Sequence, residues 1–82
     1  MNYQFLETVK AEIETSPMCN GYKVDVYIEP SISSILFCIT VDSYKHIFKA
    51  PFGLLETNIT AMTLAEIIID EVKEWRDKLN ED

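Results

Sequence analysis

The chain has 82 residues, 48% of them hydrophobic and 26% charged, and its formal net charge at pH 7 is −7. This length and composition support one folded domain over residues 1–82 and exclude a disordered chain. The negative charge disfavours direct binding of nucleic acid, because that binding depends on Lys and Arg contacts with phosphates. The longest apolar run, residues 35–39, is far shorter than the roughly 20 residues of a membrane span. No basic and apolar leader begins the sequence, so the expected location is the cytoplasm.

The first predicted element is an amphipathic helix over residues 2–15. Asn2 can cap its start, and Pro17 prevents its continuation. Asn20-Gly21 then predicts a turn. The apolar side of this helix consists of Phe5, Leu6, Val9 and Ile13.

Three strands are predicted to follow. Apolar and polar residues alternate with period two over residues 22–29, with Val24, Val26 and Ile28 on one face. Residues 30–34 read as a loop, and residues 35–41 are apolar on both faces, which predicts a central strand. A third strand is expected over residues 44–50.

A tight turn at Asp42-Ser43 fixes the register of the second and third strands. If the turn has two residues, three inward-facing pairs follow, and all of them share a face with Ile35. The predicted pairs are Val41 with Tyr44, Ile39 with His46, and Phe37 with Phe48.

The final predicted element is a long amphipathic helix. Thr63 and Glu66 fit a capping box at its start. The preceding residues, 57–62, either extend the helix or form a turn of their own. An apolar stripe along the helix consists of Leu64, Ile68, Val72, Trp75 and Leu79.

These elements predict an α+β domain of helix, three-stranded antiparallel sheet and helix (αβββα). Both amphipathic helices need an apolar partner, and the sheet has only one strongly apolar face. We therefore expect both helices to pack on that face and to form a two-layer domain.

No arrangement of residues predicts chemistry. His46 is the single histidine, and the expected register places it on the opposite sheet face from Cys38, which disfavours a catalytic dyad. Cys19 and Cys38 lack the spacing of a zinc site, and no Gly-rich phosphate loop or EF-hand loop is present. We expect no catalytic residue, no metal and no cofactor.

Seven of the 14 acidic residues lie between residues 66 and 82. Carboxylates four residues apart lie on one side of a helix at about 6 Å spacing, and like charges at this spacing cost about 0.2–0.5 kcal/mol per pair. One interpretation is a docking surface for a basic groove on a partner protein. The other is a solvated helix face on which Glu66 serves the cap and the helix dipole. The candidate docking residues are Asp70, Glu74, Asp77 and Glu81.

The outer face of the sheet is the second candidate surface. Tyr27, Leu36 and Ile47 are expected there, together with Cys38 and Thr40 and with a border of charged residues. An exposed apolar patch of this kind is typical of a protein-binding site or a homodimer interface. The alternative is that the segment 51–62 folds back and covers the patch with Phe52, Leu54 and Leu55.

The element order and the length resemble the double-stranded-RNA-binding domain. That family binds phosphates through lysines at the start of its last helix. This chain has Thr63, Leu64, Ala65 and Glu66 at those positions, so RNA binding is not expected.

The short, acidic character of the whole chain, with this element order, is also similar to small phage-encoded inhibitors, including anti-CRISPR proteins that fill the DNA-reading groove of a nuclease. This resemblance is one of character and has no shared motif. It implies an inhibitor that mimics DNA.

The expected function is that of a non-enzymatic protein-binding module. In the first interpretation, the acidic helix blocks a basic or nucleic-acid-handling surface of a partner protein, without membrane or direct nucleic-acid contact. In the alternative, the chain is a structural or assembly subunit that self-associates through the outer sheet face. The two differ in salt dependence, because carboxylate-driven docking weakens steeply with ionic strength whereas apolar association does not.

Overall fold

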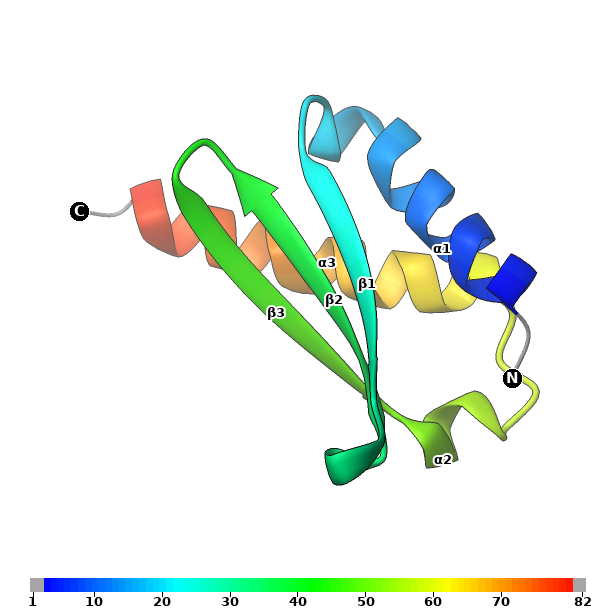
Figure 1. Cartoon of the computed structure of the whole chain (residues 1–82). Helices are drawn as coiled ribbons and strands as arrows, with labels where there is room; N and C mark the ends of the chain where they lie inside the picture. Colours follow the sequence, from blue (N-terminus) through cyan, green and yellow to red (C-terminus); the bar gives the residue numbers. More distant parts are fainter. Residues whose placement is uncertain (1–2, 81–82) are drawn as a thin grey trace.

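The helices and strands expected from the sequence are present in the computed structural model, which describes residues 3–80 (Figure 1). The fold is α+β, with an N-terminal helix, an antiparallel sheet and a C-terminal helix that packs against the first. The elements in chain order are α1 (Tyr3–Thr15), η1 (Pro17–Cys19), β1 (Lys23–Glu29), η2 (Pro30–Ile32), β2 (Ser34–Val41), β3 (Tyr44–Pro51), α2 (Phe52–Leu55) and α3 (Ala61–Asn80).

The end of α1 follows from the local sequence. Pro17 opens the short 3-10 turn η1, and the hydroxyl of Ser16 caps that turn by accepting the Met18 N–H at 3.4 Å. Gly21 then takes a positive φ of 83°, a conformation that favours glycine. The predicted cap Asn2 lies outside the described residues.

The sheet has the strand order β1-β2-β3, with β2 in the centre as predicted. The expected register is confirmed: Val41 lies opposite Tyr44, Ile39 opposite His46, and Phe37 opposite Phe48. Asp42 has a φ of 54° in the two-residue turn, which suits a tight hairpin. The turn and the alternation of side chains therefore select one pairing.

Both long helices cover the same face of the sheet. In Figure 1, α3 passes behind the three strands, and its first turns lie beside α1. Side chains from both helices and from the inward positions of all three strands form one buried cluster. Phe37 is fully buried in this cluster and contacts Phe48 edge to face, with ring centroids 6.5 Å apart. The two-layer packing predicted from the sequence is confirmed.

Polar contacts also connect the helices to the rest of the domain. Glu14 on α1 accepts the backbone N–H of Val24 at 3.3 Å. Arg76 on α3 donates to the carbonyl oxygen of Met18 at 3.2 Å. Because each contact joins two different elements, the two contacts help to fix the orientation of the helices on the rest of the domain.

The start of α3 differs from the sequence-based expectation. The predicted capping box at Thr63 and Glu66 is wrong, because the hydroxyl of Thr60 accepts the Thr63 N–H at 3.1 Å and the helix begins at Ala61. Glu66 is therefore an exposed residue of the second helical turn with no role in the cap.

The segment 51–62 contains a short helix that the sequence did not predict, and of residues 57–62, for which the sequence left a helix extension or a turn open, only the last two extend α3. Its first part forms the short helix α2, whose end is closed by the Thr57 hydroxyl donating to the Leu54 carbonyl oxygen at 2.6 Å. Its last two residues belong to α3. Phe52, Leu54 and Leu55 pack against the buried cluster, on the helix side of the sheet. The segment therefore does not cover the outer sheet face.

The apolar stripe of α3 is buried most deeply along its first half. Leu64 and Ile68 have no exposed surface and Val72 is 2% exposed, whereas Trp75 is half-buried and Leu79 is 36% exposed. The helix thus extends past the edge of the core toward its C-terminal end.

Adjacent isoleucines of α3 provide a matched test of this packing. Ile68 is fully buried and Ile67 is 41% exposed. We expect Ile68→Ala to lower the free energy of unfolding by about 2–5 kcal/mol and Ile67→Ala to change it by less than about 1 kcal/mol. Urea unfolding followed through the fluorescence of Trp75 measures both, and equal losses for the two variants would contradict the packing.

Candidate functional site

The side of α3 that faces away from the core carries a row of carboxylates, here named the acidic stripe: Glu66, Asp70, Glu74 and Asp77. All four side chains are exposed. Within residues 3–80, the one ion pair that involves them is a marginal contact of 4.0 Å between Asp77 Oδ1 and Arg76 Nη2. Three of the predicted docking residues thus share one exposed surface, and the fourth, Glu81, lies outside the described residues.

Helical periodicity explains why the stripe points outward. Leu64, Ile68 and Val72 anchor the opposite side of α3 in the core, so residues half a turn away from them face solvent. Lys73 is exposed beside the carboxylates and lowers their net charge. The packed helix fixes the spacing of the backbone positions that carry these carboxylates.

The outer sheet face is the second surface, and it is defined here by the residues at its centre: Tyr27, Leu36, Cys38, Thr40 and Ile47. Tyr27 and Ile47 are 56% and 57% exposed, although both are large and apolar. Neither long helix packs on this face, because both lie on the other side of the sheet. Tyr27, Leu36 and Ile47, which the sequence singled out, therefore lie together on adjacent strands.

Charged residues flank this apolar centre asymmetrically. The β1 side carries Asp25 and Glu29, and the β3 side carries Lys45 and Lys49. Lys23 lies at the end of the β1 side. Glu29 accepts a hydrogen bond from the Ser31 hydroxyl at 2.7 Å. No ion pair joins the two flanks among the described residues.

The two surfaces lie on opposite sides of the domain. The sheet and α3 form separate layers (Figure 1). The acidic stripe lies on the side of α3 opposite its buried residues, and it therefore faces away from the sheet. A partner bound to one surface therefore leaves the other accessible.

A pair of His46 and Glu71, between the helix-facing side of the edge strand β3 and α3, was not predicted. His46 Nε2 lies 2.6 Å from Glu71 Oε2, and the imidazole stacks on Trp75 with ring centroids 5.2 Å apart. The pair connects β3 to α3. The predicted register correctly placed His46 on the helix-facing side of the sheet. The sequence could not identify its partner on α3, because that depends on how the helix crosses the sheet.

Among the described residues, neither Cys38 nor a metal-binding cluster accompanies the pair of His46 and Glu71. Cys38 lies opposite Ile47 on the outer face, so its separation from His46 is confirmed. Among residues 3–80, no group of three or more His, Cys, Asp or Glu side chains could hold a metal ion. That His46 and Cys38 have no catalytic or metal role stays a prediction.

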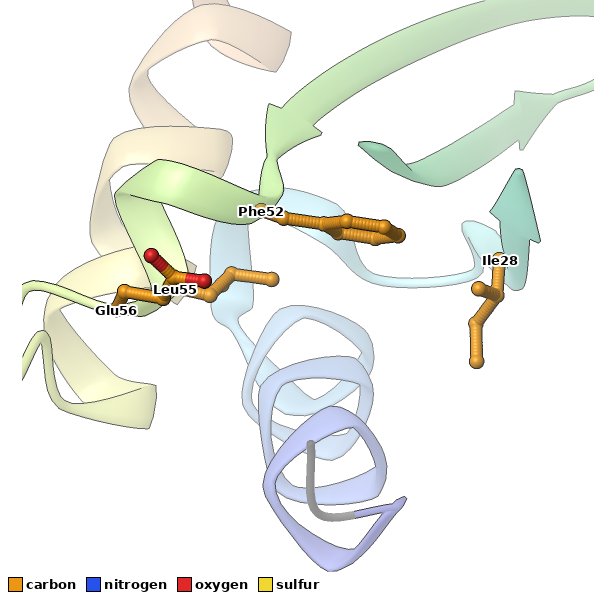
Figure 2. Close-up of a pocket in the computed structure, with 4 residues that line it drawn as sticks. All are labelled: Ile28, Phe52, Leu55 and Glu56. Carbon is orange, nitrogen blue, oxygen red and sulfur yellow. The ribbon is translucent and has the colours of Figure 1, made fainter. Parts of the chain in front are cut away.

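An apolar pocket of about 420 Å³ lies at one corner of the domain (Figure 2). Phe52 and Leu55 of α2 line one side, Ile28 at the end of β1 lines the other, and Glu56 lies at its margin. Ile28 is 41% exposed, because the helices do not extend over this end of the sheet. The sequence did not predict this pocket, since its walls come from separate elements.

Comparisons with known proteins give no assignment. No protein-family model matches the chain, and no curated protein or solved structure is found to match it. In the part of the chain that the structure describes, no helix has the length and apolar character needed to cross a membrane.

The two cysteines lie in contrasting environments and allow a test of the inner and outer faces. Burial raises the pKa of the Cys19 thiol, and the nearby Arg76 guanidinium opposes this only in part. Because the thiolate is the reactive form, we expect iodoacetamide to modify half-buried Cys38 at least about tenfold faster than Cys19 in the folded protein at mildly alkaline pH.

Mass spectrometry of dilute protein measures both rates, and Cys38→Ser isolates the slow site. In denaturant the two rates should converge. Equal rates in the folded state would show that Cys19 is not part of the core.

Proposed function

We propose that this chain is a non-enzymatic protein-binding module and that the acidic stripe docks on a basic surface of a partner protein. The observation that carries this proposal is the row of exposed carboxylates on a helix whose other side is held in the core. A surface that binds nucleic acid is rich in Lys and Arg, so its positive charge is complementary to the stripe. Occupying that surface makes the chain an inhibitor, which is also the mode that the resemblance to acidic phage-encoded inhibitors implies.

The spacing of the stripe supports a partial mimicry of nucleic acid. Carboxylates four residues apart are separated by about 6 Å along the helix, whereas a DNA strand carries about one phosphate per 3.4 Å of axis. The stripe therefore presents about half the linear charge density of one strand. Such a density suits a groove lined with a few Lys or Arg side chains.

Rigidity also supports the proposal. Residues of α3 on the side opposite the stripe are buried, so the helix backbone that carries the carboxylates needs little ordering when a partner binds. The like charges at four-residue spacing disfavour the free helix slightly, and a basic partner removes this repulsion. Relief of this repulsion therefore adds to the binding free energy, while the repulsion costs the free domain little stability.

The test is a triple variant that removes charge and keeps shape: Asp70→Asn, Glu74→Gln and Asp77→Asn. We expect its affinity for a captured basic partner, and for a lysine homopolymer as a defined probe, to fall more than tenfold at low ionic strength, mainly through slower association. The free energy of unfolding should hold or rise slightly, because the repulsion between Asp70 and Glu74 is relieved.

A matched control separates the stripe from net charge. Glu7, Glu12 and Glu56 are exposed positions outside the stripe, and changing all three to Gln removes the same charge. Loss of affinity in the triple stripe variant but not in the control supports docking through the stripe. Equal affinity of the stripe variant and wild type at every salt concentration would refute the proposal.

A further inference from the structure

We propose that the outer sheet face binds a second copy of this chain, with twofold symmetry that places β1 of one copy over β3 of the other. This inference does not depend on the proposed docking of the acidic stripe, which lies on the opposite side of the domain. The proposed symmetry fixes the orientation of the two copies.

The apolar centre of the face supplies the reason for association. Tyr27 and Ile47 each expose more than half of their surface, with Leu36 and Cys38 between them on β2. The segment 51–62 packs on the helix side and leaves this centre uncovered. Two such faces can pack about 10 Å apart in the aligned arrangement common to sheet pairs.

The charged flanks select a copy of the same chain as the occupant. Three lysines and two carboxylates border the outer face, which gives this face a net charge of +1 within a chain of −7. The remainder of the chain thus carries −8. The outer face therefore lacks the net negative charge that would oppose the approach of two acidic copies.

The position of each flank selects the symmetry axis. An axis parallel to the strands places the carboxylates of β1 over the lysines of β3 at both edges of the interface. Asp25 and Ile47 are both paired with Cys38 of β2, so Asp25 lies between Lys45 and Lys49 along the strand direction. An axis across the strands would place β3 over β3 and gather four lysines.

Lys23 is the one charge that this arrangement does not pair. Lys23 and Lys45 are both paired with Thr40 of β2, so they lie at the same position along the strands. This position is the end of the face beside the hairpin turn, where long lysine side chains can extend into solvent. The like-charge approach there weakens the interface without displacing it.

The size of the face predicts a weak dimer. Three strands spaced about 4.8 Å apart and about 24 Å long give a footprint of about 350 Å² on each copy. Specific stable complexes bury about 800 Å² of accessible surface per partner. We therefore expect a dissociation constant in the range of about 10 µM to about 1 mM.

The decisive experiment is a full charge swap of the flanks: Asp25→Lys, Glu29→Lys, Lys45→Glu and Lys49→Glu. The swap leaves the net charge at its wild-type value. With β1 over β3, the swapped chain should self-associate within about threefold of wild type, as measured by sedimentation equilibrium. It should not form mixed dimers with wild type, because like charges then meet at both edges; native mass spectrometry of an isotope-labelled mixture measures this.

A half swap and a stripe control complete the test. Asp25→Lys with Glu29→Lys should weaken self-association at least about tenfold, although it lowers the net negative charge of each copy. The triple stripe variant should associate as wild type does, which separates this inference from the proposed function. Circular dichroism melting confirms that each variant is folded.

A measurement on the unaltered chain guards against variants that fail to fold. Cys38 lies in the centre of the proposed interface, so its alkylation should slow as the protein concentration rises through the dissociation constant. The inference is overturned if wild type is monomeric up to about 1 mM, if swapped and wild-type chains mix freely, or if the half swap associates as tightly as wild type.

Discussion

The burial of a single sheet face under both helices determines the other features of this domain. Phe37 and its neighbours Ile35 and Ile39 on β2 have no exposed surface, and they are covered by α1 and α3 together. Within residues 3–80, the structure has no further long element with which to cover the other face. The same packing therefore creates both candidate surfaces: it leaves the outer sheet face open, and it turns the acidic stripe of α3 away from the sheet.

The two surfaces differ in the kind of interaction that each can make. In the proposed function, the acidic stripe supplies a long-range attraction to a basic partner, and this attraction depends on ionic strength. The outer sheet face offers apolar contact between flanks of opposite charge, which supports the proposed packing of a second copy. In a twofold dimer through the outer faces, the two acidic stripes point away from each other. Such a dimer presents two docking surfaces. Once a partner with two basic sites has bound one surface, its second site meets the other at a high effective concentration, which raises the overall affinity.

Local patterns account for what the sequence predicted correctly. The period-two alternation and the turn at Asp42-Ser43 fix the hairpin register, because a slip of one residue would move the apolar side chains to solvent. The acidic stripe follows from spacing within one helix. The start of α3 was misplaced because Thr60 and Thr63 are both good capping residues three positions apart, and only the structure shows which hydroxyl accepts the free N–H. The position of Glu71 beside His46 and the side on which the segment 51–62 packs depend on contacts between distant elements, for which the sequence has no local signal.

The central claim is that the chain has two independent interaction surfaces on opposite sides of one sheet-and-helix core. Amide chemical-shift mapping by NMR tests it most directly, with the same labelled protein in two titrations. Dilution should shift amides of β1, β2 and β3 and leave α3 unchanged, whereas a lysine homopolymer should shift amides of residues 66–77 and leave the strands unchanged. If both titrations perturb one common set of residues, or if neither reaches its assigned surface, the account is contradicted.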